Sequence, residues 1–313
     1  MKQTITIGTR GSQLALWQAE YVRKCLNDHF PDHSIELKVI KTIGDKIRDR
    51  SLVGLGKGVF TKEIEIALLD GTIDLAVHSM KDLPTDLPDG LCIAAIPVRE
   101  DPRDVLVTQS GLLLDQLSQA AKIGTTSPRR KSQLLHLQPD LQVVDVRGNL
   151  DTRLRKLHET DLDGLILAAA GIKRLIGEEI ITEYFETDRM VPAAGQGALG
   201  VEAREDDPEI KMLLDAINDT HSETEVFAER AVLSELGGGC QVPIGVNAQL
   251  RNDKLHLIAT VCSPDGKHRI LERLSSCFES SSDQGDLACA QELAVNLATK
   301  LIQSGAHKLK SET

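Results

Sequence analysis

Short apolar runs alternate with stretches of helical periodicity through the first two thirds of the chain. After a first run, Leu14, Trp17, Tyr21 and Leu26 recur at helical spacing until Pro31 interrupts the pattern. Strands that alternate with helices in this way are typical of an α/β sheet with crossover helices. In the first hundred residues the pattern predicts strands at 4–8, 36–42, 74–78 and 91–96 and a second helix at 61–70.

A second alternating set begins after the segment 99–103, which has the composition of a linker. Its strands are predicted at 105–107, 122–126, 141–146 and 165–170. Each of them except the first leads into a helical pattern, which predicts a second α/β domain. The glycine-rich segment AAGQGALG at 193–200 then reads as a turn, hinge or ligand loop, and a strand is predicted at 199–203.

The last third of the chain changes character. Ser222 and Glu225 have the spacing of a capping box and predict the start of a helix. The predicted apolar face of this helix consists of Phe227, Ala228, Ala231, Val232 and Leu236. The turn sequences RND and SPDG separate three further apolar runs, which predicts an antiparallel meander. These strands are predicted at 242–250, 255–262 and 269–278, and a last helix at 287–301.

Composition narrows the function classes. The chain has 313 residues, of which 41% are hydrophobic and 27% charged, as in an ordinary folded protein of two or three domains. A net charge of −11 argues against a general nucleic-acid binder, which needs an electropositive surface. Aromatic residues make up only 3%, which argues against a groove that stacks successive bases.

Targeting and metal signals are missing from the sequence. Polar residues interrupt every apolar run near the N-terminus, and no run approaches the roughly 18 residues of a membrane span. We therefore expect a cytoplasmic protein that binds no membrane. The six cysteines form no CxxC pair and no cluster at zinc-ligand spacing, so we expect neither disulfides nor a bound metal.

Basic residues gather in one part of this acidic chain. The segment 129–174 carries nine basic and six acidic residues, whereas the rest carries a net charge of −14. Ser127 suits an N-cap and Pro128 a first helical turn, so Arg129 and Arg130 are predicted at a helix N-terminus. Cations oppose the helix dipole there, which favours a nearby anion. Strand-to-helix junctions rich in arginine indicate a crevice for a carboxylated or phosphorylated ligand, the alternative being a solvated basic surface.

Three further segments are candidates for chemistry. GLGKGVF at 54–60 lacks phosphate-loop spacing and is better interpreted as a mobile loop that presents Lys57 to an anion. In HSMKDLP at 78–84, Lys81 and Asp82 follow a strand, so this segment is either an ordinary turn or a site that moves protons. On its own, His78 is interpreted as a packed or capping residue.

The segment ELGGGCQVPIG places Cys240 directly after three glycines. Three consecutive glycines are entropically costly unless the loop must bend sharply or admit something bulky. A thiol presented there is a nucleophile or an attachment point, and the alternative is a free loop cysteine.

Nine motifs in order resemble the porphobilinogen deaminase family, also called hydroxymethylbilane synthases. They are TRGSQLALWQ, GKGVFTKEIE, HSMKDLP, REDPRDV, GTTSPRR, RGNLDTRL, LAAAGIKRL, VPAAGQGALG and GGGCQVPIG. The resemblance implies an α/β fold of three domains: two α/β domains like those of periplasmic binding proteins and a small α+β C-terminal domain with a three-stranded antiparallel sheet. The domains that it implies cover 1–98 with 198–216, 103–192, and 220–313.

The resemblance also implies the activity. A member of this family is a transferase of tetrapyrrole and heme biosynthesis that deaminates four porphobilinogen molecules and joins them head to tail. The primer is a dipyrromethane cofactor, held by a thioether to the cysteine that matches Cys240. Hydrolysis then releases hydroxymethylbilane (preuroporphyrinogen). No metal takes part, and a monomer is the family's usual state.

The motifs carry residue roles over to this chain. Asp82 matches the catalytic aspartate. The implied cofactor-binding residues are Cys240, Lys81, Asp82, Thr125, Thr126, Ser127, Arg129, Arg130, Arg147 and Gly171. The implied substrate-binding residues are Arg10, Ser12, Gln18, Arg147, Arg153 and Arg174.

The match has departures and competitors. Pro128 stands where the family usually has Leu, and Thr126 where it often has Ser, so a slightly altered cofactor pocket is implied. A non-catalytic two-domain clamp for an anionic metabolite would explain the arginines but not the GGGC loop. An inactive homologue would lose Asp82 or Cys240, and both residues are present. The sequence therefore favours an active deaminase.

Overall fold

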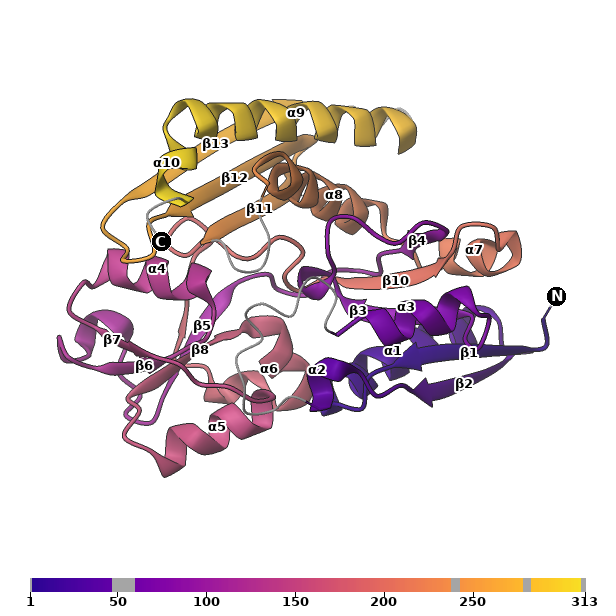
Figure 1. Cartoon of the computed structure of the whole chain (residues 1–313), viewed down its shortest axis with the longest axis horizontal. Helices are drawn as coiled ribbons and strands as arrows, with labels where there is room; N and C mark the ends of the chain where they lie inside the picture. Colours follow the sequence, from indigo (N-terminus) through magenta and orange to yellow (C-terminus); the bar gives the residue numbers. More distant parts are fainter. Residues whose placement is uncertain (1, 47–59, 238–242, 278–282, 311–313) are drawn as a thin grey trace. The chain divides into compact units, whose positions relative to one another are not determined.

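The computed structural model describes residues 2–46, 60–237, 243–277 and 283–310. The chain divides into two compact units, shown in Figure 1. The first unit consists of Met1–Glu100 and Ala198–Glu223, and the second of Asp101–Gly197 and Thr224–Thr313. The chain therefore passes between the units after Glu100, after Gly197 and again after Glu223, within a helix.

The first unit is built on a sheet in the strand order β2-β1-β3-β10-β4. β2, β1 and β3 are parallel, and β10 runs antiparallel to both of its neighbours. The helices α1 and α7 cover one face of the sheet, and α3 covers the other. The elements are β1 (Thr4–Thr9), α1 (Gln13–His29), β2 (Ser34–Val39), α2 (Ile43–Lys46), α3 (Lys62–Leu69), β3 (Leu75–Ser79), the 3-10 turn η1 (Met80–Asp82), β4 (Leu91–Ala95), β10 (Leu199–Arg204) and α7 (Pro208–Asp215).

The second unit contains a sheet in the order β7-β6-β8-β5-β9. β7, β6 and β8 are parallel, and β5 is antiparallel to β8 and β9. α5 and α6 pack on one face and α4 on the other. The elements are β5 (Asp104–Thr108), η2 (Leu114–Gln116), β6 (Lys122–Gly124), α4 (Pro128–Leu137), β7 (Gln142–Val144), α5 (Leu150–Glu159), β8 (Gly164–Ala168), α6 (Ala169–Leu175), η3 (Glu178–Ile180) and β9 (Glu183–Tyr184).

A third sheet, also in the second unit, has three antiparallel strands in the order β11-β12-β13. Asn252 and Asp253 form the two-residue turn between β11 and β12, with φ of 51° and 57°, as a type I′ hairpin requires. α9, yellow in Figure 1, lies along this sheet. The elements are α8 (Thr220–Glu235), β11 (Ile244–Arg251), β12 (Lys254–Cys262), β13 (Arg269–Cys277), α9 (Asp283–Gln303) and α10 (Ala306–Lys310).

The start of α8 differs from the prediction. The helix begins at Thr220, ahead of the predicted N-cap. The Asp219 carboxylate accepts from the Ser222 backbone N–H at 2.8 Å, and the Ser222 hydroxyl accepts from the backbone N–H of Arg99 at 2.9 Å. A capping box at Ser222 is therefore wrong, because an acceptor three residues earlier takes its place. Phe227, predicted on the apolar face, is 37% exposed.

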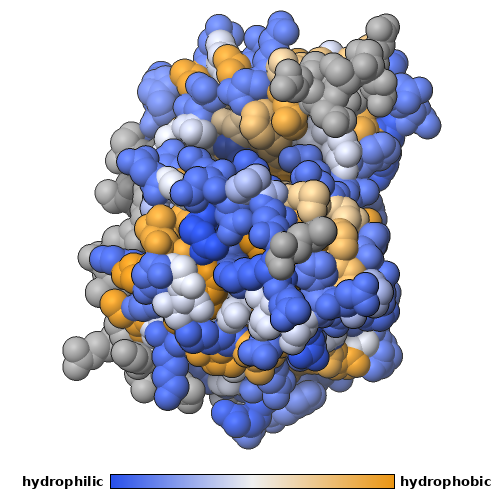
Figure 2. Space-filling view, turned by 90° about the vertical axis from the view of Figure 1, so that its right-hand side faces the viewer, coloured by the Kyte–Doolittle hydropathy of each residue, from blue (hydrophilic) through white to orange (hydrophobic). Residues whose placement is uncertain are grey.

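Two α/β sheets and a three-stranded antiparallel sheet confirm the predicted fold class. On the face shown in Figure 2, hydrophilic side chains predominate and hydrophobic ones lie in small groups between them. Within the described ranges, no helix is long and apolar enough to cross a membrane.

Candidate active site

The first unit contains a cavity of about 60 Å³ at the carboxyl ends of β1 and β3. In open α/β sheets, ligands bind beyond the carboxyl ends of the strands. The residues that line it are Arg10, Ser12, Leu14, Ala15, Gln18, Phe60, Thr61, Val77, His78, Ser79 and Asp82. Four predicted site residues, Arg10, Ser12, Gln18 and Asp82, are therefore brought together although they lie in two separate sequence motifs.

Asp82 is presented by the turn η1, directly after β3. The backbone N–H of Met80 donates to the carbonyl of Ala198 at 3.1 Å, and that of Leu83 donates to Met80 at 3.2 Å. The side chains of Met80 and Leu83 are buried, with exposures of 1% and 5%, while Asp82 is exposed. The buried side chains of Met80 and Leu83 thus hold the Asp82 carboxylate at the surface of the cavity.

The other predicted residues of this cavity have structural partners. The Ser12 hydroxyl caps α1 by accepting from the backbone N–H of Ala15 at 3.3 Å. The buried side chain of Gln18 donates to the Ser79 hydroxyl at 2.8 Å. The Arg10 guanidinium lies 4.1 Å from the centre of the Phe60 ring, a cation–π distance. Phe60 ends the segment GLGKGVF but was not predicted as a site residue, because only Lys57 of that segment was considered for binding.

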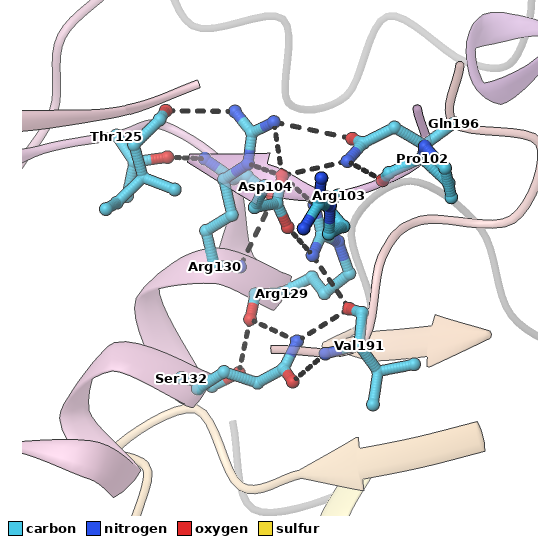
Figure 3. A network of polar contacts seen from close by, with 12 residues as sticks. Pro102, Arg103, Asp104, Thr125, Arg129, Arg130, Ser132, Val191 and Gln196 are labelled. Carbon is cyan, nitrogen blue, oxygen red and sulfur yellow. Dashed lines mark hydrogen bonds and ion pairs between the residues drawn. The ribbon is translucent and has the colours of Figure 1, made fainter. Parts of the chain in front are cut away.

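In the second unit, Arg129 and Arg130 converge on a carboxylate that the sequence reasoning missed, Asp104 of β5 (Figure 3). Arg129 donates from Nη1 to Oδ2 of Asp104 at 2.5 Å and to the carbonyl of Val191 at 2.8 Å. Arg130 donates from Nε to Oδ1 of Asp104 at 2.9 Å. The Gln196 amide donates to the same Oδ1 at 2.9 Å. The anion expected at this helix N-terminus is thus supplied, at least in part, by the protein itself.

The charge state of Asp104 follows from these contacts. The side chain is fully buried, with 0% exposure. Burial alone would raise the pKa of its carboxyl, but the two guanidiniums outweigh burial and hold that pKa well below its usual range. Asp104 is therefore ionised and paired with Arg129 and Arg130, both of which are almost wholly buried. Ser127 and Pro128 occupy the predicted N-cap and first-turn positions of α4, so the Pro128 departure leaves this helix start intact.

The remaining predicted arginines lie near α5 and α6. Arg153 donates from Nε to the carbonyl of Gly148 at 2.8 Å, and Arg147 accepts at its carbonyl from Lys156 at 3.1 Å. Arg174 donates to the carbonyl of Gly197 at 2.7 Å, which ties α6 to the end of this unit's first segment. Thr125 is buried, and its hydroxyl accepts from the backbone N–H of Ser127 at 3.2 Å.

Three further predicted residues, Lys81, Thr126 and Gly171, lie in described segments. Lys81 is half-buried in η1, and Thr126 is half-buried between β6 and α4. Gly171 lies inside α6, where, among the residues that the structure describes, an added Cβ would meet only Leu150, at 3.9 Å. Cys240 and Lys57 lie outside the described residues. No cluster of His, Cys, Asp or Glu side chains in the part of the chain that the structure describes has the arrangement of a metal site.

Two family models match the chain. The model of the porphobilinogen deaminase dipyrromethane cofactor binding domain matches residues 5–212. The model of the porphobilinogen deaminase C-terminal domain matches residues 223–303. Together they cover all three sheets.

Similar proteins extend over the whole length. A porphobilinogen deaminase of Syntrophomonas wolfei is 51% identical over 99% of this chain and 99% of its own. Those of Chlorobium phaeobacteroides and Geobacter sulfurreducens are 46% and 47% identical, over 100% and 98% of this chain and 98% and 94% of theirs. Among solved structures, the methionine binding protein MetQ is similar at a TM-score of 0.44 and 14% identity, over 73% of this chain and 96% of its own. From its matched domains and full-length relatives, the chain belongs to the porphobilinogen deaminase family.

Proposed function

We propose that Asp82 is the catalytic group with which this chain joins four porphobilinogen units head to tail onto a dipyrromethane primer, before hydroxymethylbilane is released by hydrolysis. The observation that carries the proposal is the exposed Asp82 carboxylate in the cavity that also contains Arg10. When the amine leaves the substrate, positive charge develops on its pyrrole nitrogen. A fixed carboxylate beside that N–H stabilises the charge and can exchange a proton.

The carboxylate side chains of the substrate need cationic side chains to bind them. We propose that Arg10, which lies over the Phe60 ring and lines the cavity, binds an acetate or propionate group there. Ser12 and Gln18 hold the cavity wall through their own hydrogen bonds and present polar atoms to it. Arg147, Arg153 and Arg174 of the second unit are proposed to bind further carboxylates of the growing chain.

The residues of the second unit fit a dipyrromethane, whose side chains are carboxylates. Arg129 and Arg130 provide two guanidiniums in the first turn of α4, and among the described residues an added Cβ at Gly171 would meet only Leu150. We propose that these residues hold the cofactor with Lys81, Thr125, Thr126, Ser127 and Arg147, and that Cys240 attaches it. When bound, the cofactor supplies the pyrrole to which new units are added. Asp104 holds both guanidiniums through ion pairs and hydrogen bonds.

We further propose a monomeric, cytoplasmic enzyme that binds neither nucleic acid nor membrane. A net charge of −11 disfavours association with nucleic acid and with anionic lipid surfaces.

Intact mass of the purified protein, followed by peptide mapping around Cys240, tests the proposal. The expected result is an added mass of two linked pyrrole units on Cys240 and consumption of porphobilinogen with release of ammonia. Protein without the adduct should acquire it from porphobilinogen, whereas Cys240→Ser should not. A wild-type protein that neither carries nor acquires the adduct would contradict the proposed function.

A further inference from the structure

A buried imidazole–carboxylate pair lies behind the Asp82 cavity. Nε2 of His78 is 3.0 Å from Oε2 of Glu202, and the two side chains are 5% and 0% exposed. β3 and β10 are antiparallel with His78 opposite Gly200 and Ala76 opposite Glu202. The two side chains are therefore diagonal neighbours on one face of the sheet, although 124 positions separate them in sequence.

A second carboxyl completes this cluster from the helix that covers the same face. Glu65 of α3 is only 8% exposed, and its Oε1 has no hydrogen-bond partner among the described residues. Burial raises the pKa of the Glu65 carboxyl above its ordinary value, and the nearby Glu202 carboxylate raises it further, against the effects of Thr61 and His78. Glu63 on the same helix also raises it.

His78 connects this cluster to the cavity. His78 lines the cavity together with Asp82, and its Nε2 lies 3.0 Å from Oε2 of Glu202. A carboxylate on one ring nitrogen fixes the tautomer and the ring orientation, which leaves Nδ1 for proton exchange. The sequence alone interpreted His78 as a packed residue, and its burial agrees, but packing does not explain a second buried carboxyl with an unpartnered oxygen.

We propose that His78 carries a proton for the chemistry beside Asp82, and that Glu202 is the residue that positions it. This inference rests on the proposed function. In each addition the substrate's C–N bond breaks and its electron pair leaves with ammonia, a new C–C bond forms, and the receiving ring carbon loses its proton. The substrate amine enters protonated and so leaves as ammonia; His78 accepts the ring proton at Nδ1 and passes it to that ammonia, so that ammonium leaves and atoms and charge balance.

The test compares His78→Gln and Glu202→Gln with Glu205→Gln, a matched control on an exposed side chain just beyond β10. Gln at 78 keeps an amide donor toward Glu202 but cannot carry a proton. Both cluster variants should retain the cofactor mass and a KM near that of the wild type, with kcat reduced about 10²-fold. Glu205→Gln should match the wild type in cofactor mass, KM and kcat. In His78→Gly, added imidazole should restore turnover, which a merely structural role would not allow.

The outcomes separate the two proposals. Three results would overturn the role of His78. His78→Gln could lose the cofactor mass, or it could change KM while kcat stays that of the wild type. His78→Gly could carry the cofactor yet gain no turnover when imidazole is added. If His78→Gly does not fold, the kcat and KM of His78→Gln decide. A wild-type protein that fails to consume porphobilinogen would instead remove the proposed function, and this inference with it.

Discussion

Nη1 of Arg129 lies 2.5 Å from Oδ2 of Asp104, so a buried ion pair joins the first turn of α4 to β5. Cations at a helix N-terminus oppose the helix dipole, and a carboxylate against them offsets that repulsion. The same carboxylate holds Arg130 and Gln196. Asp104 therefore organises the arginines before any ligand arrives.

Replacing Asp104 with Asn should destabilise the protein by about 3–5 kcal/mol, because it leaves two buried guanidiniums without their carboxylate. Chemical denaturation at pH 7 measures this difference. Asp115→Asn is the matched control, since Asp115 also pairs with an arginine but is 72% exposed. An exposed pair should contribute less than about 1 kcal/mol. Equal effects of the two variants would contradict the role given to Asp104.

The same ion pair predicts a dependence on pH. The pKa of Asp104 is lower in the folded state than in the unfolded chain, so the folded state favours the charged form. Its stabilisation is fully present above the unfolded value of about 4 and is lost as pH falls toward the folded value. The difference in unfolding free energy between wild type and Asp104→Asn should be constant from about pH 5 to 8 and narrow below about pH 4. A gap that widens on acidification would show the opposite sign.

Asp82→Asn should fold normally and lose turnover by about 10²-fold or more, because an amide can neither stabilise a cation equally nor carry the proton. Steady-state ammonia release and a thermal melt measure the two properties. Asp89→Asn, an exposed aspartate in the loop before β4, is the control and should retain both. Near-normal turnover of Asp82→Asn would remove Asp82 from its role.

Gly171→Ala should separate stability from cofactor loading. Alanine is favoured over glycine inside a helix by about 0.5–1 kcal/mol, and within the described ranges its Cβ would meet only Leu150 at 3.9 Å, so the unfolding free energy should rise. Loading should fall if the cofactor approaches this backbone. Intact mass and denaturation measure the two effects. Gly245→Ala gives the contrast, because its Cβ would lie 2.5 Å from the Val191 carbonyl and should destabilise by about 1–3 kcal/mol.

Local chemistry made much of the fold predictable. Ser127 and Pro128 begin α4 as expected, and the predicted strands of the third sheet overlap the observed ones. Both predictions depend only on neighbouring residues, because helix capping and strand alternation are local patterns. α7 was not predicted although Asp207 and Pro208 carry a start signal. The two-residue strand β9 is too short to show any alternation.

Long-range partners explain what remained hidden in the site. Asp82 was recognised as a candidate because its motif is contiguous. Asp104 meets Arg129 across 25 positions, and Glu202 meets His78 across 124, so no spacing in the sequence indicates either contact. Phe227 was misplaced because helical spacing identifies an apolar stripe but not how far the neighbouring elements cover it.

The position of β10 determines when the strands of the first sheet can pair during protein synthesis. This strand lies between β3 and β4, yet it is made of residues 199–204, after the whole sheet of strands β5 to β9. During synthesis, residues 104–184 are made before β10. We therefore expect the edges of β3 and β4 that pair with β10 to stay unpaired until Leu199–Arg204 has been made.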